Sequence, residues 1–307
     1  MSEFILRTNN LTKKYKNDFA LENVNVSIKK GEIYGLIGQN GAGKSTMLRL
    51  VTGLSFPTDG SIELFGNDHP SELTEVQKRM GAIIENPALF PNMTAYENLE
   101  VHRLQKGIPG RSCIQNTLEL VGLLDTGKKK AKNFSLGMKQ RLGLGIALLS
   151  DPEFLILDEP TNGLDPMGIV EMRELIKRLN HEKGLTVLIS SHILSELHQL
   201  ATSFGIIHKG KILEELTLKE LDEKCKMHVR VKVDQSAIGA TVLEDTLSTT
   251  DFEVMPDGTI KLYKYLNDVR SVSQALTNNG LVIEHLSQNG DSLESYFSKL
   301  VGGVDID

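Results

Sequence analysis

The sequence predicts a large α/β domain, built on a mostly parallel sheet covered by helices, followed by a small α+β domain. The first observation is the length of 307 residues, about twice the commonest domain size. The second is that short apolar runs alternate with amphipathic helical stretches from about residue 30 to residue 210, which is typical of parallel sheets. The third is a change of pattern beyond Lys211. We therefore expect two domains, residues 1–219 and 220–307.

In the first domain, apolar runs predict the strands of the main sheet at residues 33–37, 81–84, 154–157, 186–189 and 204–207. Apolar residues at helical spacing predict helices at residues 47–52, 114–121, 138–149, 170–179 and 193–200. The beginning of the chain differs from this alternation. There, residues 4–7, 21–28 and 61–65 resemble strands joined by polar turns. They predict an antiparallel β patch beside the main sheet.

Residues 88–150 have a mostly helical pattern. The pattern begins with Thr94 and Glu97, which are spaced as in a capping box at the start of a helix. We therefore expect a helical subdomain that interrupts the α/β core.

The C-terminal part predicts the order strand, helix, strand, strand, helix, strand, at residues 227–233, 236–247, 252–255, 259–265, 269–278 and 281–286. The turn Pro256-Asp257-Gly258 separates the two central strands, and a last helix is expected near residues 293–300. This βαββαβ order is typical of a ferredoxin-like α+β domain.

Composition excludes several classes of protein. Asp and Glu number 40 against 34 Lys and Arg, a formal charge of −6, so we expect no nucleic-acid partner. The two cysteines, Cys113 and Cys225, form no metal-binding spacing and favour a reducing compartment. The N-terminus does not resemble a signal peptide, and no apolar run is long enough to span a membrane. If the protein works at a membrane, we expect another chain to cross it.

The strongest motif is GQNGAGKST at residues 38–46, which follows an apolar strand and precedes a helix. This is the context of a phosphate-binding loop, in which backbone N–H groups surround a phosphate, Lys44 reaches the β and γ oxygens and Ser45 binds Mg²⁺. The alternative, a glycine-rich turn without a ligand, is much less favoured in this context. The expected nucleotide-binding residues of the loop are Gly38, Gln39, Asn40, Gly41, Ala42, Gly43, Lys44, Ser45 and Thr46.

Two adjacent carboxylates follow the strand at residues 154–157. Ligands of α/β sheets bind at the carboxyl ends of the strands, where Asp158 and Glu159 lie. We expect Asp158 to hold Mg²⁺ and Glu159 to orient the water that attacks the γ-phosphate. An Asp-Glu pair alone is more often a solvated strand end, but the phosphate loop makes the catalytic interpretation several times better supported.

Three further segments follow in order: NFSLGMKQR at residues 133–141, Asn162-Gly163-Leu164-Asp165, and Ser190-Ser191-His192. They resemble the signature motif, D-loop and switch histidine of ABC transporter ATPases. The resemblance covers residues 1 to about 215 and implies a P-loop ABC ATPase cassette with an antiparallel β patch and a helical subdomain.

The resemblance also implies roles for individual residues. Tyr15 occupies the place where the family stacks an aromatic ring on adenine. Ser135 and Gly137 would contact the γ-phosphate of the nucleotide on an opposite subunit, and Asp165 would contribute from the D-loop. His192 would join Glu159 and Lys44 as a catalytic residue by bridging Glu159 and the γ-phosphate.

The chain departs from the family pattern at three positions. Leu136 and Met138 replace a glycine and a glutamine of the usual signature motif. Glu85 occupies the position of a glutamine that usually contacts Mg²⁺ and the membrane subunit. We expect it to be a metal ligand; the alternative, which the sequence supports about equally, is a conservative substitution in a solvated loop. The run around Glu85, IIENPALFPNMTAYENL, and the segment SSHILSELHQLAT resemble the bacitracin and lantibiotic-immunity branch of ABC exporters.

These observations predict an ATP-hydrolysing subunit that uses ATP and Mg²⁺ and pairs with a second cassette, identical or different. The resemblance further implies a transmembrane permease subunit, a place at the cytoplasmic face of the cell membrane, and export of an antimicrobial peptide or drug. The alternatives are a soluble ABC-type regulatory protein not coupled to transport and a P-loop kinase. The kinase is disfavoured because no kinase needs the signature segment.

Overall fold

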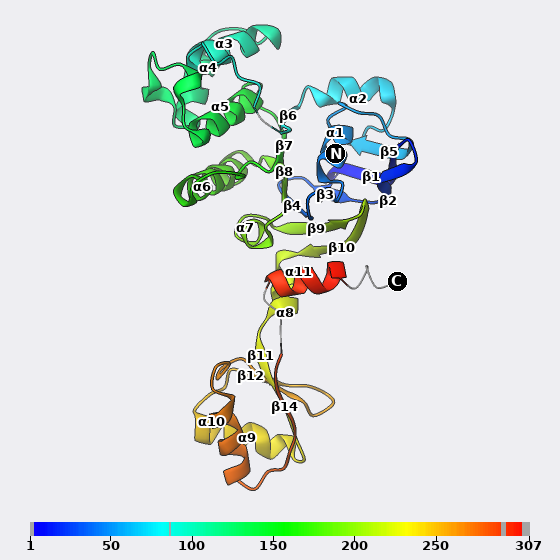
Figure 1. Ribbon diagram of the computed structural model, residues 1–307, viewed down its shortest axis with the longest axis vertical. Helices are drawn as coiled ribbons and strands as arrows, with labels where there is room; N and C mark the ends of the chain where they lie inside the picture. Colours follow the sequence, from blue (N-terminus) through cyan, green and yellow to red (C-terminus); the bar gives the residue numbers. More distant parts are fainter. Residues whose placement is uncertain (1–2, 86, 290–292, 303–307) are drawn as a thin grey trace. The chain divides into compact units, whose positions relative to one another are not determined.

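The computed structural model describes residues 3–85, 87–289 and 293–302. The chain divides into two compact units, Met1–Leu218 and Lys219–Asp307, which Figure 1 colours from blue to green and from yellow to red.

The first unit is built on a six-stranded sheet with the strand order β10-β9-β4-β8-β7-β6. Its members are β4 (Ile33–Ile37), β6 (Met80–Ile83), β7 (Phe154–Asp158), β8 (Thr186–Ser191), β9 (Ser203–His208) and β10 (Lys211–Thr217). The first five are parallel and confirm the predicted strands, whereas β10 is antiparallel to β9 and was not predicted. Every residue of β4, β7 and β8 is buried, because helices or strands cover both faces of a parallel sheet.

A second, antiparallel sheet contains β1 (Phe4–Tyr15), β2 (Asp18–Val24), β3 (Ser27–Lys29) and β5 (Asp59–Leu64). The β patch is confirmed, but the prediction of one strand at residues 21–28 was wrong. The chain turns at Asn25, between β2 and β3, and the Asn25 side chain accepts the Asn10 N–H. The core of this region joins both sheets through α1 (Lys44–Val51), for example through Leu6, Leu36 and Met47.

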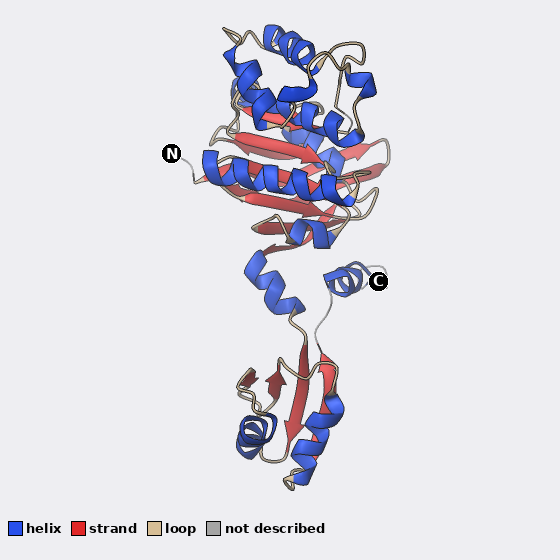
Figure 2. Ribbon diagram, turned by 90° about the vertical axis from the view of Figure 1, so that its left-hand side faces the viewer, coloured by secondary structure: helices blue, strands red, loops and turns tan. Residues whose placement is uncertain are grey.

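Three helices form an insertion between β6 and β7: α3 (Ala95–Gln105), α4 (Ser112–Leu120) and α5 (Leu136–Leu148) (Figure 1). Short 3-10 turns at Leu124–Thr126 and Ala131–Asn133 connect α4 to α5. The predicted capping box is confirmed, since Glu97 N–H donates to Thr94 Oγ1 at 3.2 Å and Thr94 N–H donates to Glu97 Oε2 at 2.7 Å. The remaining helices are α2 (Pro70–Gln77), α6 (Pro166–Lys183) and α7 (Leu194–His198); α6 and α7 cover one side of the central sheet (Figure 2).

The second unit has a four-stranded antiparallel sheet with the order β12-β13-β11-β14. Its elements are β11 (His228–Val233), α9 (Ser236–Leu247), β12 (Phe252–Val254), β13 (Ile260–Leu262), α10 (Val269–Asn278) and β14 (Ile283–Asn289). This is the predicted βαββαβ order. Helices α9 and α10 pack on one face of the sheet through Leu243 and Leu276, which meet Val229 and Val231. Two more helices, α8 (Leu218–Cys225) and α11 (Leu293–Gly302), flank this arrangement in sequence.

A tyrosine is buried inside the main sheet. Tyr34 of β4 is 2% exposed, and its hydroxyl donates to Glu215 Oε1 of β10 at 2.7 Å. The strand between them has Gly205 at this point, where a Cβ would lie 2.1 Å from the Tyr34 hydroxyl. Burial, followed by the charge and the hydrogen bond of Glu215, raises the pKa of Tyr34 well above its ordinary value.

The substitution Tyr34→Phe tests this contact. At neutral pH the variant should be less stable by about 1 kcal/mol, the usual net value of one hydrogen bond. Because the pKa of Tyr34 is raised in the folded state, its contribution is present below the unfolded value of 10.0 and is lost as the pH rises further. Urea unfolding of both proteins should therefore show the difference shrinking above about pH 10. A difference that stays constant, or grows, with pH would contradict this account.

Candidate functional site

The loop from Gly38 to Gly43 joins the carboxyl end of β4 to α1. Its shape requires glycine, because Gly41 and Gly43 have φ angles of 82° and 112°. A Cβ on Gly38 would lie 2.5 Å from the Ile207 carbonyl oxygen, and one on Gly43 would lie 2.7 Å from that of Ala20. The N–H groups in the first turn of α1 have no partner within the helix. The loop and the helix therefore form a cradle that fits a phosphate.

Lys44 places a positive charge inside this loop. Its side chain is only 5% exposed, and its ammonium donates to the carbonyl oxygens of Gly38 at 2.7 Å and Gln39 at 3.2 Å. It also lies 3.1 Å from Oε1 of Glu159. A buried ammonium group that donates hydrogen bonds into the loop suits an anionic ligand there.

The two carboxylates lie at the end of β7, beside the end of β8. Asp158 is buried and accepts the Ser190 hydroxyl at 2.6 Å. Glu159 has a left-handed backbone, with φ 46°, and its N–H donates to Ser190 Oγ at 3.0 Å. Its second carboxylate oxygen lies 2.9 Å from His192 Nδ1. Glu159 is thus held between Lys44 and His192.

A cavity of about 470 Å³ lies against these groups. Its lining residues come from the phosphate loop, the two carboxylates, the loop after β6, the signature segment and the D-loop: Ser45, Glu85, Leu136, Gln140, Asp158, Glu159, Asn162 and Gly163. The cavity contains hydroxyl and carboxylate oxygens, the donors that Mg²⁺ prefers together with phosphate oxygens. Among the described residues, no three His, Cys, Asp or Glu side chains form a closed metal cluster. The donor set therefore fits Mg²⁺ bound together with a nucleotide.

Glu85 has a partner that the sequence analysis did not single out. Its backbone is left-handed, with φ 66°, and its carboxylate contacts the guanidinium of Arg49 on α1. Arg49 and Glu85 are 40% and 61% exposed, and such exposed pairs contribute little to stability. Glu85 lines the same cavity as Ser45 and Asp158, so its carboxylate is shared between the site and Arg49.

Only Ser45, Glu85, Asp158 and Glu159 of the predicted site residues line this cavity. Lys44 and His192 contact Glu159 from outside the lining, and the four residues expected at the adenine or at an opposite subunit lie elsewhere. Ser135 and Asp165 are the N-caps of α5 and α6, where they accept the N–H groups of Met138 at 3.2 Å and Gly168 at 3.1 Å. Gly137 lies in the first turn of α5. Tyr15 is 48% exposed at the end of β1, and the Lys13 ammonium is 5.0 Å from the centre of its ring.

Sequence reasoning gave no role to two residues that contribute to the site, one beside the cavity and one in its lining. Ser190 bonds both Asp158 and the backbone of Glu159, and its place at the end of a buried strand was a signal that could have identified it. Gln140 is 6% exposed and lines the cavity, and its Oε1 atom has no hydrogen-bond partner among the described residues. The helical period of α5, which places it one turn after Leu136, could have indicated this position.

Comparison with known proteins agrees with this geometry. The family model described as ABC transporter matches residues 21–162. The "Bacitracin transport ATP-binding protein BcrA" of Enterococcus faecalis is 42% identical over 98% of this chain and 97% of its own length. The protein of the same name from Bacillus licheniformis is 43% identical over 97% of this chain and 98% of its own. The "Lantibiotic transport ATP-binding protein SrtF" of Streptococcus pyogenes is 48% identical over 71% of this chain and 92% of its own.

Solved structures agree as well. The structure of cbiO1 from Clostridium perfringens, described as part of the ABC transporter complex cbiONQ, superposes with a TM-score of 0.67 and 25% identity, covering 80% of this chain and 97% of that one. A dimeric bacterial ABC transporter cassette superposes with a TM-score of 0.63 and 29% identity over 69% of this chain and 98% of that one. The predicted cassette fold is therefore confirmed. This chain belongs to the family of ABC transporter ATP-binding subunits, which bind and hydrolyse ATP.

Proposed function

We propose that this chain powers the export of an antimicrobial peptide of the bacitracin or lantibiotic type and so gives its cell resistance or immunity. The observation that carries the proposal is the extent of the likeness to the two BcrA proteins, which includes the second unit and spans 97% to 98% of this chain. The likeness to SrtF spans 71% of the chain, so it supports the same class of cargo through the cassette. Nothing in the comparisons favours a regulatory protein without transport.

In the proposed mechanism, the phosphate loop binds ATP. Lys44 and the N–H groups at the start of α1 hold the phosphates, because both present positive charge in a confined loop. Ser45, Asp158 and Glu85 would hold Mg²⁺, which supplies neutralising charge to the phosphate oxygens.

Glu159 is the proposed general base. Its carboxylate orients the attacking water and accepts the proton that the water loses. This role is supported by the contacts to Lys44 at 3.1 Å and His192 at 2.9 Å, which fix both carboxylate oxygens. His192 is then a positioning residue for Glu159 and a candidate contact to the γ-phosphate. Ser190 orients the backbone from which Glu159 extends.

A second cassette, identical or different, would complete each site. Ser135 supports this, because its oxygen caps α5 by accepting the Met138 N–H and its hydroxyl hydrogen remains able to donate. A helix N-terminus with such a donor suits a phosphate held by another subunit. Gly137 and Asp165 lie in the first turn of α5 and at the N-cap of α6, and we assign them to this same shared face. Tyr15 is the proposed adenine contact.

Transport also needs a part that crosses the membrane. None of the helices in residues 3–85, 87–289 and 293–302 is long and apolar enough to do so. We propose a separate permease subunit that holds this chain at the cytoplasmic face of the membrane. Phe90 and Tyr96 are 39% and 40% exposed beside the start of α3, and they offer an apolar surface for that subunit.

Glu159→Gln tests the proposed function. The amide cannot accept the proton of the water, so ATP turnover should fall by about a hundredfold or more while ATP binding is kept. Cells that carry the permease and the wild-type chain should survive bacitracin or a lantibiotic, and cells with the variant should not. The measurements are the ATPase rate, ATP affinity by calorimetry and the inhibitory concentration of each peptide.

Two results would contradict different parts of this proposal. Turnover within a few-fold of wild type would remove Glu159 from its role. Normal wild-type turnover without protection against either peptide would leave the ATPase intact and reject the proposed cargo.

The pair Glu85→Gln and Arg49→Gln tests the metal contact. Glu85→Gln replaces a charged carboxylate ligand with a neutral amide oxygen and frees the Arg49 cation, so more Mg²⁺ should be needed for half-maximal hydrolysis. Arg49→Gln instead leaves the carboxylate unshared, so less Mg²⁺ should be needed. Magnesium titrations at fixed ATP check both shifts, and superimposable curves for the three proteins would mean that Glu85 does not act on the metal.

A further inference from the structure

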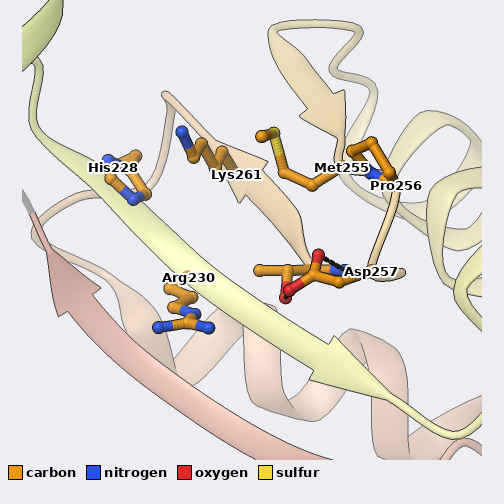
Figure 3. Close-up of a pocket in the computed structure, with 7 residues that line it drawn as sticks. His228, Arg230, Met255, Pro256, Asp257 and Lys261 are labelled. Atoms are coloured by element: carbon orange, nitrogen blue, oxygen red, sulfur yellow. Dashed lines mark hydrogen bonds between the residues drawn. The ribbon is translucent and has the colours of Figure 1, made fainter.

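The second unit contains a cavity of about 330 Å³ that is separate from the nucleotide site. It is lined by His228 and Arg230 of β11, Lys261 of β13 and the segment Met255-Pro256-Asp257, whose side chains Figure 3 shows. Alternate residues of β11, Val229 and Val231, are buried against α9 and α10. Because side chains alternate along a strand, the cavity lies on the sheet face that these two helices leave uncovered.

Two basic residues lie opposite each other on neighbouring strands of this sheet face. Arg230 and Lys261 are direct partners in the antiparallel register of β11 and β13. Like charges at such positions destabilise a sheet. The domain is otherwise acidic, with more Asp and Glu than Lys and Arg in residues 219–307. An anion between the two side chains would turn this repulsion into attraction.

Neighbouring cations of the same unit already have partners. The Lys232 ammonium lies 3.6 Å from a Glu284 carboxylate oxygen, and the Lys226 ammonium lies 3.7 Å from the centre of the Tyr263 ring. In contrast, neither Arg230 nor Lys261 has a carboxylate within ion-pair distance among the described residues. Arg230 and Lys261 therefore carry positive charges that are not neutralised by an ion pair in the described part of the chain, and a bound anion could pair with them.

The two nearby carboxylates accept hydrogen bonds from other groups. Glu253, opposite Lys261 in the register, accepts the Tyr263 hydroxyl at 2.8 Å. Asp257 accepts both the N–H and the hydroxyl of Thr259 at 3.0 Å. These two hydrogen bonds, helped by the charge of Arg230, lower the pKa of Asp257. Asp257 therefore stays negative at the edge of the cavity and weakens the binding of an anion there.

The remaining lining groups limit the choice of anion. Two unpaired cations match a phosphate monoester, which carries about two negative charges and three acceptor oxygens, better than a singly charged carboxylate. The Arg230 fork favours phosphate oxygens. His228 Nδ1 lies 3.1 Å from the Lys226 carbonyl oxygen, which leaves Nε2 for a ligand. Met255 and Pro256 give the cavity an apolar side that suits the organic part of such a molecule.

We propose that this cavity binds a phosphate group, held between Arg230 and Lys261 and carried by a soluble molecule or a lipid headgroup. The site belongs to the second unit and uses no residue of the nucleotide site. It gives the appended domain a ligand of its own.

Calorimetry with inorganic phosphate tests the site on the full chain, with ADP and Mg²⁺ at saturation to occupy the phosphate loop. Arg230→Gln and Lys261→Gln should each weaken binding by about tenfold, because each removes a charge-assisted contact. Asp257→Asn should strengthen binding, since it removes the opposing charge. Arg270→Gln and Lys264→Gln are matched controls at exposed positions that do not line the cavity, and they should bind as wild type does.

Vesicles distinguish the two sources of phosphate. Co-sedimentation is measured with phosphatidylcholine vesicles that contain phosphatidic acid, and with phosphatidylcholine alone. Binding to the acidic vesicles that needs Arg230 and Lys261 supports a lipid headgroup, and binding of inorganic phosphate alone with the same dependence supports a soluble ligand. Binding of neither probe, or binding that both substitutions leave unchanged, would overturn the proposal.

A stability measurement separates lost binding from lost folding. Without phosphate, Arg230→Gln should unfold at the same temperature as wild type or higher, because it removes the repulsion by Lys261. Lys261→Gln removes this repulsion and also the attraction of its other register partner, Glu253, so it should unfold near the wild-type temperature. If either variant unfolds at a lower temperature than wild type, its weaker binding could come from lost folding. The Asp257→Asn variant then tests the site, because stronger phosphate binding by it supports the proposal and unchanged binding refutes it.

Discussion

The buried charge of Lys44 is the constraint on which the nucleotide site depends. A cation in a protein interior must be paired or hydrogen-bonded, because loss of hydration is costly. Here the loop carbonyls of Gly38 and Gln39 and the carboxylate of Glu159 surround the ammonium. The loop can turn back on the lysine only because Gly38 and Gly43 have no side chains that would collide with Ile207 and Ala20. The charge is thus held ready for phosphate by the loop itself.

The parallel sheet supplies the other half of this arrangement. Ile37 is the register partner of Ser191, and Asp158 is that of Ser190, so the ends of β4, β7 and β8 lie side by side. Glu159 leaves this edge with a left-handed backbone, a conformation that non-glycine residues rarely adopt and that is common at functional sites. The turn carries its carboxylate between Lys44 and His192. One sheet edge therefore brings the phosphate loop and the proposed general base together.

Much of the fold could be predicted from the sequence because its strands are continuous apolar runs and its loops carry strong motifs. The missed strand β10 has one buried residue and four polar residues among its seven, and the chain turns at Asn25 between β2 and β3. The residues of the proposed site were predicted where a motif names them. The pairing of Arg49 with Glu85 and the bonds of Ser190 were not, because they join residues far apart in sequence. For the same reason, the pairing of Arg230 with Lys261 on neighbouring strands becomes visible only with the strand register.

The affinity of Lys44→Ala for ATP tests the central claim most directly. If the buried ammonium is the main charge that holds the phosphates, calorimetry with ATP and Mg²⁺ should show binding weakened by about tenfold to a hundredfold, the loss of one charge-assisted contact of about 1.5 to 3 kcal/mol. Lys183→Ala, an exposed lysine on α6 that pairs with Asp151, is the matched control and should bind ATP as wild type does. Equal affinity for Lys44→Ala and wild type would contradict the account, because the loop backbone alone would then hold the nucleotide.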